Sequence, residues 1–264
     1  MTEAATLLAP KERSDRGLAL QAEVNAQPAP PPTTPVEESI RDFVYAEVWN
    51  RPGLDRRSRY LISIAGAVMS AAPQAMIDGY VRGALTSGDL TLAELREAAL
   101  HLAVYGGWPR GLDFDAAISR AQQALGLDSA DYPPIRAEEW DPVARGEVGQ
   151  ANFTSTMTFP GGPSSNPFQE AINNFVFGEM WCRPGLDERA RRWITLVGVA
   201  NSAAEVPIKS HFHAGMASGN CTREEMLEFS LQYGIHAGWP RASLVNGVIL
   251  QMAEKVAKGL PWHA

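Results

Sequence analysis

The sequence has few cysteines and lacks any long apolar run. Its two cysteines, Cys182 and Cys221, are far apart and no CxxC pair occurs, so we predict neither a dithiol redox centre nor a disulfide framework. No uninterrupted apolar stretch approaches the ~20 residues of a membrane span, and the first 35 residues lack the apolar core of a signal peptide. We therefore expect a cytoplasmic protein with no membrane partner.

An excess of basic residues is also missing. The chain has 23 basic and 30 acidic residues, which gives a net charge of −7 at pH 7. Because phosphate backbones are bound by basic surfaces, we expect no nucleic-acid partner. The length of 264 residues allows two compact units of about 100 residues each, and we expect each unit to bury its own core.

The dominant feature of the chain is an internal repeat. The segment that begins at Phe43 reads Phe-Val-Tyr-Ala-Glu-Val-Trp-Asn-Arg-Pro-Gly-Leu-Asp, and the segment that begins at Phe175 reads Phe-Val-Phe-Gly-Glu-Met-Trp-Cys-Arg-Pro-Gly-Leu-Asp. These copies lie 132 residues apart. After a one-residue difference near Pro73 the offset becomes 131, so that Gly-Trp-Pro-Arg at Gly107 recurs at Gly238.

Helical signals dominate both copies. Apolar residues recur at helical spacing from Ile40 to Val48, Asp55 can cap the next helix, and Thr91 forms a capping box with Glu94. No strand-like alternation competes with these signals. The predicted fold class is therefore all-α, with two tandem helical units related by a pseudo-twofold axis.

The predicted boundaries follow from this repeat and from the prolines. They are a flexible Pro-rich tail at 1–35, a first helical repeat at 36–126, a linker at 127–167 and a second repeat at 168–264. The tail has too few apolar residues for a core of its own. A linker of about 40 residues is long, so we expect it to wrap over one unit or to cover a pocket.

Histidines distinguish the second repeat from the first. Four aligned pairs differ in this way: Tyr80 and His211, Arg82 and His213, His101 and Gln232, and Tyr105 and His236. Two antiparallel helices could bring the rings of His211 and His236 into one cavity, where histidine suits general acid or base work near neutral pH. The alternative is that each is a hydrogen-bonded packing residue. His211 and His213 point to different helix faces, so we expect no metal site.

Each repeat also keeps a glutamate, a tryptophan and an Arg-Pro-Gly-Leu-Asp turn. In the second repeat these are Glu179, Trp181 and the turn that begins at Arg183. A structural interpretation pairs the turn arginine with the aspartate of its own turn. In a functional interpretation the arginine binds a carboxylate of the substrate and Glu179 orients a histidine. Trp239, between Gly and Pro, could form one wall of a site for a flat ligand or could pack in the core.

At these residues the chain resembles the carboxymuconolactone decarboxylase family, and it does so twice, over about 36–126 and 168–258. The segment that begins at Phe175 is similar to the family's opening segment. The downstream half of the family's pattern is matched by the following positions: His211, Gly219, Thr222, Glu225, Glu228, Gln232 and Gly238 to Pro240. The resemblance implies an all-α fold around a helical hairpin and a homo-oligomer, such as a trimer of two-repeat chains.

This chain departs from the family in two respects. The alkylhydroperoxidase-D-like redox branch requires a CxxC before the histidine, where this chain has Ala204 and Pro207, so we expect no peroxidase chemistry. The typical decarboxylase has one copy per chain, usually has tyrosine where His236 stands, and has no counterpart to His213.

The resemblance implies a carboxy-lyase that needs no cofactor and acts on a small carboxylated lactone similar to γ-carboxymuconolactone. Loss of carbon dioxide would leave a carbanion that is delocalised into the lactone carbonyl, so the substrate itself is the electron sink. In this reaction His211 would protonate carbon and Glu179 would orient its imidazole. His236 or Tyr80 would stabilise the dienolate oxygen.

The remaining roles concern substrate binding. Arg183 or Arg191 would bind a carboxylate, and further contacts are predicted from His213, Trp181, Gln232 and Trp239. Two other functions remain open. One is an isomerase, cyclase or hydratase that acts on an unsaturated carbonyl compound in aromatic degradation or specialised metabolism, and the other is a non-catalytic oligomeric binding protein.

Overall fold

A computed structural model describes residues 9–136, 139 and 141–264. Within these residues every regular element is a helix and no strand occurs, so the predicted all-α class is confirmed. None of the described helices combines the length and the apolar character needed to cross a membrane.

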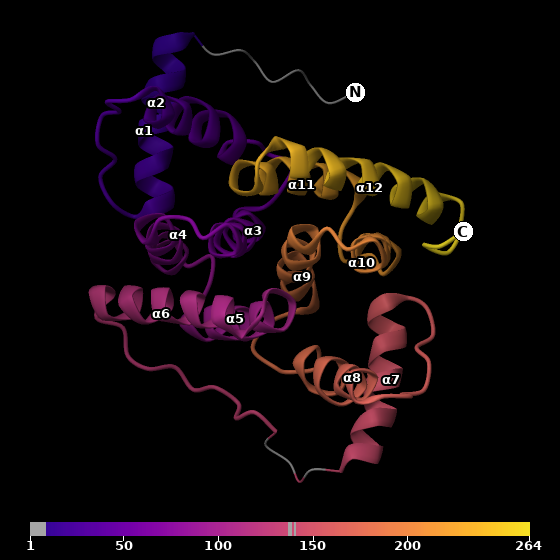
Figure 1. Ribbon diagram of the computed structural model, residues 1–264. Helices are drawn as coiled ribbons and strands as arrows, with labels where there is room; N and C mark the ends of the chain where they lie inside the picture. The colour runs from indigo at the N-terminus through magenta and orange to yellow at the C-terminus, as the bar shows by residue number, and fades with distance from the viewer. Residues whose placement is uncertain (1–8, 137–138, 140) are drawn as a thin grey trace.

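The helices form two matching series (Figure 1). The first series comprises α1 (Pro10–Asn25), α2 (Pro35–Ser39), η1 (Ile40–Trp49), α3 (Arg56–Met69), α4 (Gln74–Ser87), α5 (Leu92–Gly106) and α6 (Trp108–Leu125). The second comprises α7 (Pro142–Met157), α8 (Pro167–Ala171), η2 (Ile172–Met180), α9 (Glu188–Ser202), α10 (Glu205–Ala217), α11 (Arg223–Ala237) and α12 (Trp239–Ala257). Both η1 and η2 are π-helical, which is rare over this length.

Local signals set many of the helix ends. The side chain of Asp55 accepts a hydrogen bond from the backbone of Ser58 and so caps α3, as predicted. Both capping boxes form, at Thr91 before α5 and at Thr222 before α11. Glycines with positive φ end α4 at Gly88 and α6 at Gly126.

Helices α1 and α7 are the main difference from the sequence prediction. Residues 10–25 are not a flexible tail: they form α1, which packs against η1 and α4. The linker contains α7, which packs against η2 and α10. Since α7 begins 132 residues after α1, each repeat starts one helix earlier than predicted.

The two repeats share one core. α3 packs against α9, α5 packs against α9 and α11 packs against α3, so helices of one repeat cover helices of the other (Figure 1). One continuous cluster of buried apolar side chains runs from Val24 in α1 to Met252 in α12. The expectation of a separate core for each unit is therefore wrong, because α3 and α9 bury their apolar faces against the opposite repeat.

The Arg-Pro-Gly-Leu-Asp turns also join the repeats. Arg51 donates to Glu228 at 2.6 Å, and Arg183 donates to Glu97 at 2.7 Å. The predicted pairing of each arginine with the aspartate of its own turn is wrong. Those aspartates cap α3 and α9 and form ion pairs with arginines of the opposite repeat. The same contacts occur twice with the repeats exchanged, as a pseudo-twofold axis requires.

Candidate active site

Two related clusters of aromatic and imidazole rings lie between the repeats. We define cluster I as Trp49, Tyr80 and His236, and cluster II as Trp181, Tyr105, His211 and the adjoining His101. Trp49 is the last residue of η1 and Trp181 directly follows η2. In each cluster the tyrosine comes from the first repeat, whereas His236 or His211 comes from the second. Tyrosine and histidine have exchanged places between the clusters, because Tyr80 aligns with His211 and Tyr105 aligns with His236.

Cluster II is assembled by hydrogen bonds and by edge-to-face rings. Trp181 Nε1 donates to the hydroxyl of Tyr105 at 2.7 Å. The Tyr105 and His211 rings meet edge to face with centroids 5.4 Å apart. His101 adds a third side, 4.9 Å from the Trp181 ring and 5.3 Å from the Tyr105 ring. The site therefore draws its rings from α5, from α10 and from the residue that follows η2.

The imidazoles of cluster II keep a free nitrogen each. His101 Nε2 pairs with Thr195 Oγ1 at 2.9 Å. The Nδ1 atoms of His101 and His211 are buried and have no hydrogen-bond partner among the residues that the structure describes. Because buried polar atoms are almost always satisfied, these two nitrogens are candidates to contact a bound molecule.

Burial sets the protonation states of this cluster. It lowers the pKa of His211 to about 3, with the positive charge of Arg192 as a second cause. Burial also lowers the pKa of His101 well below its usual value, assisted by nearby positive charge. Burial raises the pKa of Tyr105 to about 12. At neutral pH both imidazoles are therefore neutral and the phenol keeps its proton.

Arg192 brings a positive charge to cluster II. Its guanidinium carbon lies 4.8 Å from the centre of the Trp181 ring, a cation–π distance. Its Nη2 donates to the backbone oxygen of Thr156 in α7 at 2.7 Å. The aligned residue in the first repeat is Tyr60, whose hydroxyl donates to the backbone of Val24 in α1 at 3.0 Å.

Cluster I has similar geometry without that arginine. Tyr80 stacks on Trp49 at 5.5 Å and meets His236 edge to face at 5.6 Å. Burial lowers the pKa of His236 to about 4, and its buried Nε2 has no partner within the described part of the chain. Tyr60 packs 5.2 Å from Trp49, in the role that Arg192 has beside Trp181.

The two histidines that sequence reasoning placed in one cavity belong to different clusters. His211 packs against Tyr105, whereas His236 packs against Tyr80 and the backbone of Gly66. Sequence reasoning had assumed that neighbouring antiparallel helices of one repeat would share a site. In the structure each histidine instead meets a tyrosine of the opposite repeat.

The predicted carboxylate-binding arginines are already engaged. Arg183 forms a two-atom ion pair with Glu97 and also donates to the carbonyls of Pro133 and Pro134. Arg191 lies 3.4 Å from Glu97 and donates to the carbonyl of Arg183 at 2.7 Å. Both guanidinium groups therefore hold the turn, and Arg183 also holds Pro133 and Pro134 of the segment predicted as a linker.

Glu179 belongs to the same ionic network. Its carboxylate accepts from Arg145 of α7 at 2.5 Å and from the backbone nitrogen of Arg136 in the linker. It also lies 3.7 Å from Arg183. The predicted role of Glu179 in orienting a histidine is not supported by these contacts, which instead fasten α7 and the linker to η2.

The other predicted residues lie outside cluster II. Gln232 is fully buried, accepts from Arg59 at 2.6 Å and donates to Ser63 at 2.8 Å. His213 pairs with the backbone oxygen of Leu260 at 2.9 Å and so holds the C-terminal segment. Trp239 is half exposed and packs against Phe43 of the first repeat.

Sequence reasoning missed Arg192 and did not assign a role to His101 or Tyr105. The signal for Arg192 was present, because the repeat aligns it with Tyr60 and so shows a charge in one copy alone. The comparison had concentrated on histidines. The signal for His101 and Tyr105 was weaker, since only the packing of α5 against α9 brings them to the second repeat.

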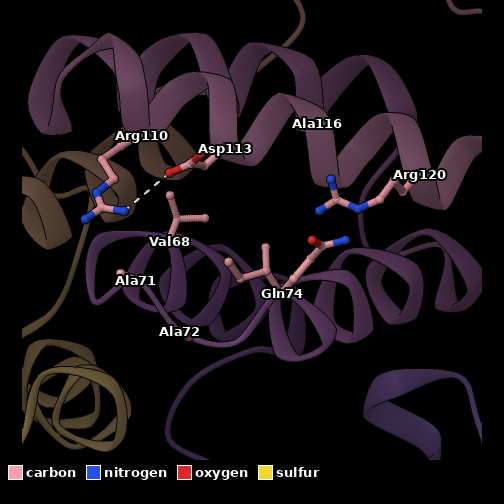
Figure 2. Close-up of a pocket in the computed structure, with 9 residues that line it drawn as sticks. Val68, Ala71, Ala72, Gln74, Arg110, Asp113, Ala116 and Arg120 are labelled. Carbon is pink, nitrogen blue, oxygen red and sulfur yellow. Dashed lines mark hydrogen bonds and ion pairs between the residues drawn. The ribbon is translucent and has the colours of Figure 1, made fainter.

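A separate pocket of about 240 Å³ lies between α6 and the turn that joins α3 to α4 (Figure 2). It shares no residue with either cluster. Its two arginines are neutralised, since Arg110 pairs with Asp113 at 3.3 Å and Arg120 pairs with Asp78 at 2.7 Å. The pocket therefore offers no unpaired charge to an anion.

Comparisons with known proteins match two regions of the chain, one in each repeat. The model of the carboxymuconolactone decarboxylase family matches residues 35–119 and 166–249, together more than half of the chain. A nitrosuccinic acid decarboxylase of Metarhizium robertsii is 41% identical over 81 residues, which are 31% of this chain and 55% of that protein. A 4-carboxymuconolactone decarboxylase of Acinetobacter baylyi is 32% identical over 93 residues, which are 35% of this chain and 66% of that protein. The chain thus spans between about half and two thirds of these relatives.

Proposed function

Because this chain belongs to the carboxymuconolactone decarboxylase family, we propose that cluster II is the active site of a decarboxylase that needs no cofactor. Its substrate would be a small carboxylated lactone similar to γ-carboxymuconolactone. The observation that carries the proposal is the meeting of two neutral imidazoles, each with a free buried nitrogen, and a protonated phenol. The names of both relatives describe decarboxylation of an organic acid.

The reaction breaks one carbon–carbon bond. Carbon dioxide departs, and the electron pair of that bond passes through the ring alkene into the lactone carbonyl to give a dienolate. A proton then adds to carbon and restores the carbonyl. The protein must therefore stabilise negative charge on an oxygen and deliver one proton.

Tyr105 would stabilise the dienolate oxygen. Its hydroxyl accepts a hydrogen bond from Trp181 Nε1, so the phenolic proton remains to be donated elsewhere. A pKa near 12 keeps that proton on the phenol at neutral pH. Tyr105 would thus act as a hydrogen-bond donor to the developing anion rather than as a proton source.

His211 would deliver the proton. The free protein holds its imidazole neutral, with a pKa of about 3, so it cannot serve as an acid before substrate binds. A bound substrate carboxylate would favour the imidazolium form and raise this pKa. His211 would then take one proton when substrate binds and pass it to the carbanion, with His101 as a neighbouring partner for proton exchange.

The proposal is tested by incubating the protein with carboxylated lactones and with nitrosuccinate while recording carbon dioxide and ring absorbance. We expect carbon dioxide release from at least one of them. His211→Ala should lower kcat/KM by about 100-fold or more, whereas His263→Ala, at an exposed terminal histidine, should match the wild type. Undiminished turnover in His211→Ala would remove the central assignment. A change in ring absorbance without carbon dioxide would favour an isomerase, cyclase or hydratase.

Assembly, cellular location and pathway stay predictions. The family resemblance implies a homo-oligomer, and we propose a trimer or a similar closed assembly of two-repeat chains in the cytoplasm that acts in the breakdown of aromatic compounds. Light scattering during gel filtration measures the mass of the particle. A monomer would contradict the proposed assembly without affecting cluster II.

A further inference from the structure

Arg192 is a buried cation whose ion pair is long and involves a half-exposed carboxylate. Its side chain is fully buried in α9. Nη2 and Nε donate to neutral oxygens, those of Thr156 at 2.7 Å and Asn220 at 3.2 Å. Nη1 is buried and has no partner among the described residues. The nearest carboxylate is that of Glu188, which lies 3.6 Å from Nη2 and is about half exposed.

The other deeply buried arginines differ in this respect. Arg183 and Arg191 share the buried carboxylate of Glu97, and Arg59 pairs with Glu228 at 3.1 Å. A buried charge without a partner is costly, so buried guanidinium groups normally face a carboxylate. Arg192 differs because its carboxylate partner, Glu188, is half exposed and 3.6 Å away.

The surroundings of Arg192 are those of cluster II. Its guanidinium lies over the Trp181 ring, and its charge is close enough to His211 and His101 to lower the pKa of each. Gly215, one helical turn after His211 in α10, leaves room for the Arg192 side chain, whose Cδ would lie 3.3 Å from a Cβ placed there. Its free nitrogen is therefore next to the rings that the proposed reaction uses.

We propose that Arg192 binds a carboxylate of the substrate through Nη1. The bound carboxylate would be one that the reaction retains, because an ion pair with the departing group stabilises the ground state and is lost as carbon dioxide forms. The substrate class is then a small organic acid with at least two carboxylates. This inference rests on the proposed function for the reaction, but the binding of the anion can be measured without turnover.

Succinate is a suitable probe because it has two carboxylates but no conjugated carbonyl that could accept the electron pair of a broken carbon–carbon bond, so it is not decarboxylated. Dimethyl succinate is its uncharged match. Calorimetry on the wild-type protein at pH 7 should detect succinate and not the diester. Arg192→Met should weaken succinate binding by about 10- to 100-fold, and Arg192→Lys by less. Tyr60→Phe, at the aligned position of the first repeat, is the matched control and should bind succinate as the wild type does.

A second readout needs no ligand. Arg192→Met removes a positive charge beside His211, so the pKa of His211 measured by NMR should rise while that of His236 in cluster I stays unchanged. A merely structural role for Arg192 would not give this selective shift. If Arg192→Met fails to fold, as judged by circular dichroism, Arg192→Lys and the diester carry the test.

The outcomes separate this inference from the proposed reaction. His211→Gln should lose carbon dioxide release and keep succinate binding. Equal affinity of the wild-type protein for succinate and its diester, absence of succinate binding, or unchanged affinity in Arg192→Met would each overturn the role of Arg192. Carbon dioxide release that depends on His211 would survive any of these results.

Discussion

Single residues decide how the two clusters differ. Tyrosine and histidine exchange places between them, and a neutral Tyr60 in one repeat becomes a charged Arg192 in the other. Tyr60 and Arg192 are both large side chains that donate to the covering helix, Tyr60 to Val24 in α1 and Arg192 to Thr156 in α7. Packing is therefore preserved while the charge of the site changes.

Because its histidines are buried, we expect the protein to have a smaller free energy of unfolding in mild acid. Burial lowers the pKa values of His211 and His236 to about 3 and 4, while an unfolded histidine has a pKa of about 6.5. Below pH 6.5 the unfolded chain binds more protons than the folded one, so the free energy of unfolding decreases as the pH falls. Each imidazole can contribute a loss of up to about 1.4 kcal/mol per pH unit.

Urea unfolding between pH 7 and pH 4.5 measures this effect. Near pH 4.5 the carboxylates of the unfolded chain also take up protons, so the histidines dominate the slope in the upper part of the window, above about pH 5.5. The double variant His211→Gln and His236→Gln should flatten the dependence, and His263→Ala should leave it as in the wild type. An equally steep decline in the double variant would mean that these imidazoles are not held neutral.

At the scale of the helix, α1 and α7 show why a whole element escaped prediction. Their contacts rely on small residues rather than on a stripe of large apolar ones. A Cβ at Gly17 would lie 2.2 Å from the carbonyl oxygen of Arg41, and one at Gly149 would lie 1.8 Å from that of Asn173. Close backbone approach of this kind gives no hydrophobic periodicity, so a sequence pattern cannot reveal it.

Two glycines of α7 provide a matched test. Gly149→Ala must push α7 away from η2 and should destabilise the protein by about 1–3 kcal/mol. At Gly146 the nearest atom to an added Cβ is 3.7 Å away, so Gly146→Ala should be neutral or stabilise the helix by up to about 1 kcal/mol. Thermal unfolding compares the two variants, and equal melting temperatures would contradict the tight contact.

At the scale of the whole molecule, the repeats depend on each other. Glu97 of the first repeat is buried between Arg183 and Arg191 of the second. Its counterpart Glu228 pairs with Arg51 and Arg59 but is more exposed, with 12% of its side chain accessible against 4% for Glu97. The pseudo-twofold arrangement thus contains two related ion-pair clusters, a tightly buried one around Glu97 and a more exposed one around Glu228.

We expect substitution of the two glutamates to lower the free energy of unfolding by unequal amounts. Glu97→Gln leaves the buried Arg191 without a carboxylate and leaves Arg183 with Glu179 at 3.7 Å, and it should cost about 3–5 kcal/mol. Glu228→Gln should cost less, because Arg51 is 37% exposed and water can replace part of the interaction. Urea denaturation of both variants measures the difference, and a larger loss in Glu228→Gln would contradict this ranking.

The sequence by itself determined the helical class, the repeat, the family and many helix ends, because capping residues, turn glycines and aligned motifs act over a few positions of chain. It also identified His211, Trp181 and the turn arginines as positions of interest. Only the tertiary structure decided which partner each one meets. The packing of α5 against α9 joins residues more than 90 positions apart, such as His101 with Thr195. Contacts between the repeats also bring Arg183 to Glu97, keep His211 and His236 in different clusters, and leave the buried Arg192 with a half-exposed carboxylate as its partner. Contacts across a pseudo-twofold axis have no local signature, since either repeat could supply the same residue type.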